Sequence, residues 1–208
     1  PAKLSLYNDI IEKQLSKGNM QVFNMLNTRY FIGNNPANNQ PVAQVNPGAY
    51  GPAWLVKSIK IVQNADEEMN ALDITNLRDT VIIQQKYASI AGQSPAYDST
   101  AVIQWVENLN DKVVYKTKSA AAQFVVFSEI YYDKGWNAYI DDKPAAYAKV
   151  NYVLRGMPVP AGSHTIEFRF EPTTVKTSKT ITTISAILVY LLLIIAGFMT
   201  WRSKKIIS

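Results

Sequence analysis

The sequence predicts a mainly β protein of the α+β class: an antiparallel β-sandwich with a small N-terminal α/β portion and one C-terminal transmembrane helix. Three features predict this class. From about residue 100, short apolar stretches alternate with turn residues at intervals of about ten positions, as in β-sandwiches. Residues 4–27 carry apolar side chains at helical spacing. Residues 181–201 contain no charged side chain.

The composition narrows the function classes. Of the 208 residues, 48% are hydrophobic and 18% are charged, which is too apolar for a disordered protein. The chain has no Cys and one His, so we expect no disulfide framework, no metal site and no cofactor. Residues 1–180 contain 18 basic and 16 acidic residues, a balance without the basic stripe of a nucleic-acid-binding domain. We therefore predict no nucleic-acid partner.

Residues 1–98 form the predicted N-terminal portion. Apolar residues recur at helical spacing over residues 4–15. Gly18 suits the end of that helix, and Asn19 suits the N-cap of a second short helix. Further elements are expected as strands at residues 30–32, 54–62 and 78–85, with a short helix at residues 66–72.

Residues 33–52 are predicted to form a long loop. The stretch is rich in Gly, Pro, Asn and Gln, which favour turns over regular structure. A loop of this length inside a compact domain is unusual, so it is either an excursion with a role or a poorly ordered segment.

Residues 99–175 form the predicted β-sandwich domain, after a turn-rich boundary at residues 92–99. The final strand has the clearest pattern, because Ile166, Phe168 and Phe170 alternate with polar residues. Residues 123–132 are almost continuously apolar, which indicates a central strand buried on both faces. The candidate strands are residues 101–107, 113–118, 123–132, 136–140, 147–158 and 164–170.

Residues 181–201 are predicted to cross a lipid bilayer as a transmembrane helix. A span needs roughly 20 predominantly apolar residues, and Trp201 stands where an interfacial aromatic residue is expected. Residues 202–208 then form a short tail with three basic residues, against two that precede the span, Lys176 and Lys179. The positive-inside rule thus places the tail in the cytoplasm and residues 1–180 outside it, at the bacterial cytoplasmic membrane.

The start of the chain bears on this topology. The residues that follow Pro1 lack the basic-then-apolar pattern of a signal peptide. An exported domain without such a signal is expected to be the C-terminal piece of a longer protein with at least one earlier membrane span. The alternative is a tail-anchored protein whose domain lies in the cytoplasm, against the charge bias.

Motifs for catalysis are missing from the sequence. It contains no P-loop, no GxGxxG and no GxSxG. His164 follows a Pro-Ala-Gly-Ser turn, so we interpret it as a surface residue at the start of a strand. We therefore assign no catalytic residue.

One stretch is a candidate ligand-binding site. Glu129 lies in an otherwise apolar strand, and a buried carboxylate needs a partner, for which Arg155 in a second apolar strand is the natural candidate. One interpretation is an internal interaction that fixes the strand register. The other is a polar floor beneath an aromatic platform on which a sugar ring stacks. The platform residues would be Tyr131, Tyr132, Trp136 and Tyr139.

This stretch also resembles a known family. Residues 128–132 read SEIYY, residues 135–143 read GWNAYIDDK and residues 151–155 read NYVLR. With VPAGSHTIEFRFEP at residues 159–172, and with residues 25–32 and 51–56 further upstream, they resemble in order the C-terminal region of YfhO-type bacterial membrane proteins. The sequence departs from the family pattern where Asp133-Lys134 replaces a proline and where Asp142 replaces a turn glycine.

The resemblance implies a polytopic membrane protein similar to GT-C glycosyltransferases, which use polyprenyl-phosphate sugars to decorate cell-envelope glycans such as teichoic acids. In that class the catalytic acidic residue lies in the first outer loop, outside this sequence. The resemblance thus implies an accessory role for this part, in acceptor binding or structural support. The alternative is a non-catalytic glycan- or protein-binding module anchored to the membrane.

Overall fold

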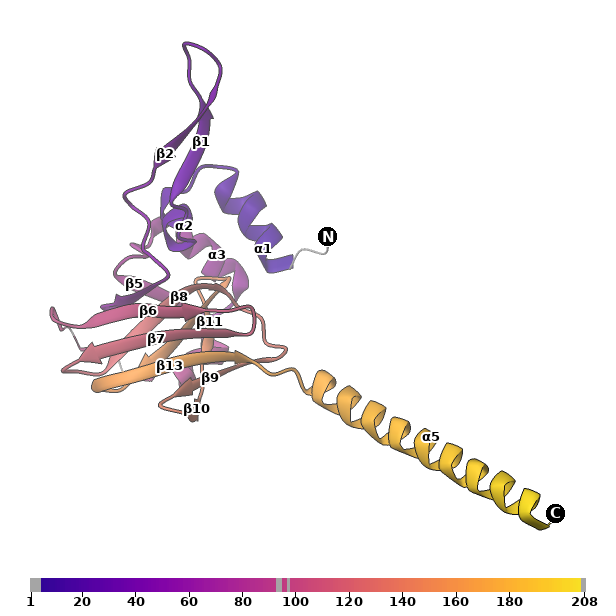
Figure 1. Cartoon of the computed structure of the whole chain (residues 1–208). Coiled ribbons are helices and arrows are strands. Elements are labelled where there is room, and N and C mark those ends of the chain that lie inside the picture. Colours follow the sequence, from indigo (N-terminus) through magenta and orange to yellow (C-terminus); the bar gives the residue numbers. More distant parts are fainter. Residues whose placement is uncertain (1–4, 93–94, 97, 207–208) are drawn as a thin grey trace.

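The computed structural model describes residues 5–92, 95–96 and 98–206 (Figure 1). Two β-sheets face each other, and an N-terminal helical layer covers the outer face of one of them. A hairpin and a long C-terminal helix project from this body in different directions. The predicted mainly β sandwich with a small α/β portion and one apolar C-terminal helix is confirmed.

The five-stranded sheet is antiparallel throughout, and each strand pairs with its neighbour in an unbroken ladder apart from one irregularity in the edge strand β6. In spatial order its strands are β10 (Lys143–Ala145), β9 (Trp136–Ile140), β13 (Gly162–Phe170), β7 (Lys112–Ser119) and β6 (Val102–Asn108).

The six-stranded sheet is antiparallel except for one parallel pair, β4 with β5. In spatial order its strands are β3 (Ala53–Val56), β8 (Gln123–Ile130), β12 (Leu154–Val159), β11 (Ala148–Val150), β5 (Thr80–Gln84) and β4 (Ser58–Val62). Strand β8 lies between β3 and β12 and is buried on both faces over its first five residues, as its continuous apolar pattern predicts. The sheet contains strands from both sides of residue 98.

Two hydrophobic cores use the opposite faces of β8. Val125 and Phe127 point into the space between the sheets, where Phe127 stacks on Tyr115 and Phe168 with ring centroids 4.8 and 4.9 Å apart. Phe124 and Val126 point the other way, into the core beneath the helices. This alternation follows from the two-residue period of a strand.

The helical layer consists of short segments that each bury one apolar face. Asn19 caps the second helix by accepting a hydrogen bond from the Gln21 amide, and Gly18 takes a φ of +76°, so both predicted signals are confirmed. The segments of this layer are α1 (Ser5–Ile10), a π-helical turn (Ile11–Leu15), α2 (Met20–Met25) and α3 (Ala65–Ile74). A short 3-10 turn (Gln85–Tyr87) and α4 (Ala88–Ala91) follow β5.

The predicted loop at residues 33–52 is wrong in part, because it contains a strand. Strand β1 (Tyr30–Asn34) pairs with β2 (Pro41–Val45) in an antiparallel hairpin that projects from the body (Figure 1). All five residues of β2 are exposed, so the strand has no pattern of buried positions. Its proline occupies the first position of a strand without a further neighbour, where no ladder donor is lost.

Two other predicted strands are each two strands in the structure. Residues 54–62 form β3 and β4, which lie at opposite edges of the sheet, because the Lys57 and Ser58 amides both donate to the Asp79 carbonyl and turn the chain. Residues 147–158 form β11 and β12, joined by a tight turn in which Asn151 and Tyr152 both have positive φ. Neither residue is Gly, so the sequence carries no strong turn signal there. The short strand β10 was not predicted.

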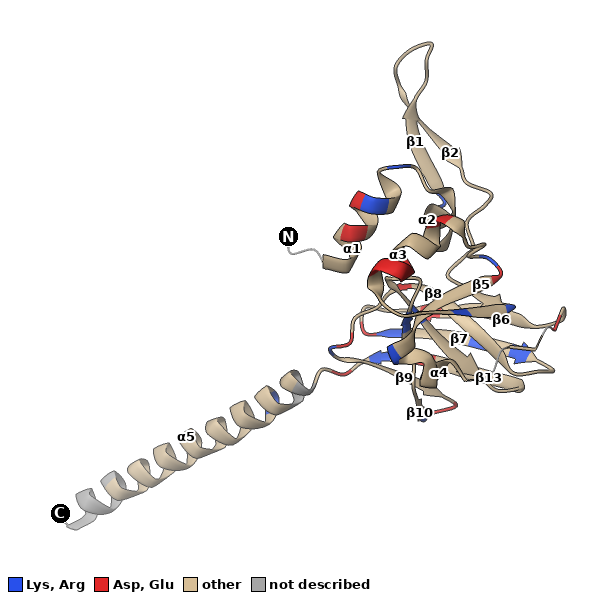
Figure 2. Cartoon of the chain, turned by 180° about the vertical axis from the view of Figure 1, so that it is seen from behind, with Lys and Arg blue, Asp and Glu red and all other residues tan. Residues whose placement is uncertain are grey.

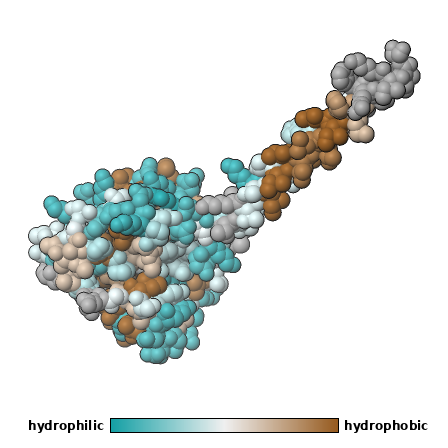
Figure 3. Space-filling model, turned by 90° about the horizontal axis from the view of Figure 1, so that it is seen from below, coloured by the Kyte–Doolittle hydropathy of each residue, from teal (hydrophilic) through white to brown (hydrophobic). Residues whose placement is uncertain are grey.

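The C-terminal helix α5 (Thr173–Ile206) carries the apolar segment Thr177–Met199, which is long and apolar enough to cross a membrane. None of this segment is buried against the domain. Figure 2 shows the helix without charge over its middle, and Figure 3 shows it as a hydrophobic rod beside a largely hydrophilic domain. The predicted span at residues 181–201 overlaps this segment, while the Trp201 side chain lies outside the described residues.

Candidate functional site

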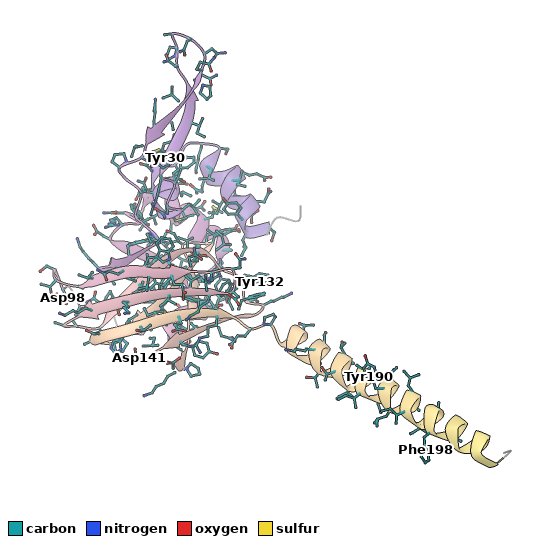
Figure 4. All side chains as sticks on the ribbon, in the orientation of Figure 1. Tyr30, Asp98, Tyr132, Asp141, Tyr190 and Phe198 are labelled. Atoms are coloured by element: carbon teal, nitrogen blue, oxygen red, sulfur yellow. The ribbon has the colours of Figure 1, made fainter. Side chains whose placement is uncertain are left out.

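The centre of the candidate site is the turn that follows β8. The Tyr131 amide donates to the Val153 carbonyl, and the chain then turns through Asp133–Gly135 into β9. Gly135 has a φ of +106°, and a Cβ there would lie 2.8 Å from Phe170 Cε2, so only glycine fits. The Glu171 amide donates to the Gly135 carbonyl, which ties the turn to the start of α5. Figure 4 shows Tyr132 at the end of the domain that faces α5, opposite Asp98.

Two cavities share this turn. One has a volume of about 380 Å³ and reaches under α1, and we call it the lysine–tyrosine cavity. Its defining residues are Lys86, Tyr87, Tyr131, Tyr132, Lys134 and Lys149. The other has a volume of about 680 Å³ and lies between the same turn and Phe170, Pro172 and Thr174, where α5 begins. The turn therefore lies beside the start of the long apolar helix.

Lys149 is the buried cation of the lysine–tyrosine cavity. Its Nζ lies 3.0 Å from the Glu68 carboxylate, and it also donates to the Tyr152 carbonyl. Glu68 additionally accepts from Gln84 Nε2 and from the Tyr152 amide, so the carboxylate is fully engaged. Burial lowers the pKa of Lys149, and the nearby Glu68 charge opposes that shift. This pair is a structural element whose charges compensate each other.

The remaining two lysines of the cavity are exposed. The Lys86 ammonium lies 5.0 Å from the centroid of the Tyr87 ring, and Lys134 lies on the turn. The Tyr87 ring in turn packs against Tyr131 at 6.2 Å. Burial, with the neighbouring Tyr87, raises the pKa of Tyr131 to about 12, so its phenol keeps its proton at neutral pH. The rim thus offers two cations, phenol groups and the exposed carboxylate of Asp133.

Arg155 has partners other than the one expected from the sequence. Its Nε donates to the Ile130 carbonyl at 3.1 Å, and its guanidinium lies over the rings of Trp136 and Phe168. Glu129 and Arg155 influence each other electrostatically, but no ion pair joins them within the described part of the chain. Burial raises the pKa of Glu129, and the Arg155 charge opposes it.

The six predicted site residues lie in four different places. Trp136 and Arg155 are in contact, and Tyr147 links them to Tyr131 by a ring contact at 5.6 Å and a hydrogen bond to the Trp136 carbonyl. Tyr132 lines both cavities at the turn. Tyr139 lies under Arg169 and donates to Glu171, and it lines a separate cavity beside Pro144 and Tyr147. Glu129 lines another cavity beside β6. The four aromatic residues therefore do not form one continuous platform.

Four residues that line the cavities were not predicted from the sequence: Lys86, Tyr87, Lys149 and, beside Glu129, Trp105. Lys149 carried the same signal as Glu129, a single charge inside an apolar strand. Lys86 and Tyr87 follow the apolar strand β5 and could not be placed near the turn without its register. Among the described residues, no group of three or more His, Asp or Glu side chains is arranged to hold a metal ion.

Comparison with known proteins identifies the chain at the family level. The family model described as bacterial membrane protein YfhO matches residues 71–182, which is more than half of the chain. No curated protein and no solved structure matches it. The matched segment runs from α3 to the start of the apolar helix and includes the turn and most of the residues around it. The chain therefore belongs to the YfhO family of bacterial membrane proteins.

Proposed function

We propose that this chain is the extracytoplasmic C-terminal domain and last membrane span of a polytopic glycosyltransferase of the GT-C type. In this proposal the parent protein transfers sugar from a polyprenyl-phosphate donor to cell-envelope glycans. This part is accessory and binds the lipid-linked sugar or the glycan acceptor. The observation that carries the proposal is that the lysine–tyrosine cavity shares its turn with the neighbouring cavity that reaches the start of α5.

The height of the site relative to the bilayer supports this ligand class. Thr174 lines the cavity that shares the turn, and the apolar segment begins at Thr177. Three helical residues correspond to a rise of about 4.5 Å. A ligand at the turn would therefore lie close to the membrane surface, where the phosphate of a lipid-linked sugar is held by its hydrocarbon chain.

The chemistry of the rim fits the same ligand. Lys86 and Lys134 are exposed and would pair with a phosphate, while the buried Lys149 is already neutralised by Glu68. Tyr131 and Tyr132 offer phenol groups to sugar hydroxyls and ring faces to a sugar's apolar side. No acidic residue at the rim is assigned a catalytic role.

A protein-binding module is the second candidate, and the hairpin favours it. Tyr30, Ile32 and Val45 lie on one face of β1 and β2 and are 60%, 78% and 69% exposed. Such a surface suits a protein partner more than a polar glycan. Figure 4 shows Tyr30 on this projecting hairpin, away from Tyr132.

Binding by the full chain in lipid nanodiscs tests the proposed ligand. A polyprenyl-phosphate hexose is titrated against the wild type and against the double variant Lys86→Ala/Lys134→Ala. We expect the double variant to bind about tenfold more weakly, which corresponds to about 1.4 kcal/mol. The matched control is Lys116→Ala/Lys118→Ala, which removes two exposed lysines of β7. An equal loss in both double variants would reduce the interaction to general charge attraction and overturn the site.

Single-cysteine labelling tests the topology, because this chain contributes no native Cys to the background. In cells that express the parent protein, Asn38→Cys on the exposed hairpin should react with a membrane-impermeant maleimide. Ser203→Cys in the basic tail should react only after permeabilisation. The reverse pattern would support the tail-anchored cytoplasmic alternative.

A further inference from the structure

Another cavity lies between the edge strand β6 and the end of β8. It has a volume of about 240 Å³ and is lined from four separate segments of the chain. We call it the Trp105 cavity, and its defining residues are Asn27, Arg29, Trp105, Asn108, Ser128 and Glu129. None of these residues belongs to the lysine–tyrosine cavity.

Trp105 supplies a flat apolar wall. It lies on the edge strand β6 and is 51% exposed. The pairing of β6 with β7 is irregular between Trp105 and Glu107, which is a β-bulge, and bulges redirect side chains at sheet edges and next to binding sites. Among the described aromatic residues, none packs its ring against Trp105, and about half of the Trp105 surface is exposed.

Polar groups surround this wall. Asn27 Oδ1 is buried and has no hydrogen-bond partner in the structure, and Asn27 itself has a φ of +56°. Because this oxygen is closed to solvent, Asn27 contributes a wall of the cavity and not an accessible acceptor. Asn108 and Arg29 add exposed donors, and Glu129 adds a half-buried carboxyl group.

The walls of the cavity are fixed by Ser128. Its hydroxyl lies 2.7 Å from the Met25 carbonyl and 2.8 Å from the Gly51 carbonyl. It therefore ties β8 to the end of α2 and to the segment before β3, close to Asn27 and Pro52, which line the cavity. A site held by three distant segments is pre-organised, which reduces the entropy cost of binding.

We propose that the Trp105 cavity binds one uncharged hexose unit of a glycan chain. The apolar face of the sugar ring would stack on Trp105, while Asn108 and Glu129 would hydrogen-bond to its hydroxyls. The volume is below the roughly 300–1,000 Å³ of drug-sized pockets, which suits a single ring. The choice of a glycan as the ligand rests on the proposed function. The location of the site does not depend on it.

The test uses the full chain in nanodiscs and a panel of neutral glucose and galactose disaccharides, followed by saturation-transfer NMR. We expect millimolar binding, at least tenfold weaker in Trp105→Ala and within threefold of wild type in Trp105→Phe, which keeps an aromatic face. Asn108→Ala should weaken binding about threefold. Val106→Ala, an exposed neighbour on the same strand, is the matched control and should change nothing.

Two results would overturn the proposal: no disaccharide of the panel binding at millimolar concentration, or binding that Trp105→Ala and Asn108→Ala leave unchanged. The double variant Lys86→Ala/Lys134→Ala separates this proposal from the proposed function, because it should bind the polyprenyl-phosphate hexose about tenfold more weakly and bind the neutral disaccharide as the wild type does. Disaccharide binding without any binding of the lipid-linked sugar would support the Trp105 cavity and contradict the lysine–tyrosine site.

Discussion

The guanidinium carbon of Arg155 lies 4.6 Å from the ring centroid of Trp136, and Arg155 is only 3% exposed. Phe168 lies on the cation as well, at 5.1 Å. Arg155 belongs to the six-stranded sheet and both rings belong to the five-stranded sheet, so this contact joins the two layers. A cation–π contact is worth about 2 kcal/mol when it is desolvated.

Trp136→Ala is therefore expected to destabilise the domain rather than to affect ligand binding selectively. The substitution removes a large packed ring and half of the aromatic cover of Arg155, which together cost about 3–4 kcal/mol. Urea unfolding of the full chain in nanodiscs measures the change. Trp136→Phe, which keeps a ring over the cation, should lose less than half as much. A Trp136→Ala protein with an unchanged unfolding midpoint but no glycan binding would show that Trp136 contacts the ligand and is not needed for stability.

The buried pair Glu68–Lys149 gives the second prediction. Both side chains are at most 5% exposed, and Glu68 receives hydrogen bonds from Gln84 and Tyr152 as well. Removing one partner leaves an uncompensated buried charge, so Lys149→Met should destabilise by about 3–5 kcal/mol. The double variant Glu68→Gln/Lys149→Met should be more stable than the sum of the two single effects predicts. Strict additivity in this double-mutant cycle would contradict the coupling.

The long-range arrangement explains which parts of the fold were predictable. Strands with one buried face, such as β13, are predictable because apolar and polar residues alternate along them. Strand β8 is predictable because it is a continuous apolar run. The hairpin β1–β2 was half missed because β2 buries nothing, and the β11–β12 turn was missed because Asn151 and Tyr152 take positive φ without a glycine. In both places the local sequence lacked the signal, and the tertiary pairing determined the structure.

The sequence indicates the chain segment that contains the candidate site, but not which residues line its cavities. A charge and several aromatic residues stand together in residues 128–139, and this segment contains the turn that lines two cavities. Their grouping failed, since β9 turns Tyr139 to the outer face of its sheet, where it bonds Glu171. Lys86 and Trp105 come from β5's end and from β6, and only the sheet register brings them near that segment.

His164 and Asp141 form a pair that should make stability depend on pH. Their side chains are joined by a hydrogen bond of 2.7 Å. This hydrogen bond is the main reason why the pKa of His164 is raised above 6.5 and the pKa of Asp141 is lowered below 3.8. The contribution of His164 to stability is fully present below pH 6.5 and is lost as the pH rises through the folded-state pKa of this residue. The aspartate contributes above 3.8 and loses its contribution as the pH falls through its own.

The contribution of this pair is thus greatest between about pH 4 and 6.5. The unfolding midpoint of His164→Gln should lie further below that of the wild type at pH 5.5 than at pH 8.5. Lys143 also acts on Asp141, so Lys143→Gln is the control for a general charge effect. A midpoint difference that stays constant across this range would show that the pair does not titrate as described.

Glu129 should give stability a pH dependence in a different window. Burial raises its pKa above 4.5, which means that the folded state holds the proton more tightly than the unfolded chain does. Stability from this group is therefore greatest below pH 4.5 and declines as the pH rises through the folded-state pKa, because a charge must then be buried.

Glu129→Gln keeps the shape and the hydrogen-bonding capacity without the titration. The variant should gain stability relative to the wild type between pH 4.5 and pH 8, measured by urea unfolding at a series of pH values. His164 is unchanged in both proteins, so its titration cancels in the comparison. A variant that loses stability relative to the wild type as the pH rises would mean that the charged carboxylate is favoured in the fold, with Arg155 as a true ionic partner.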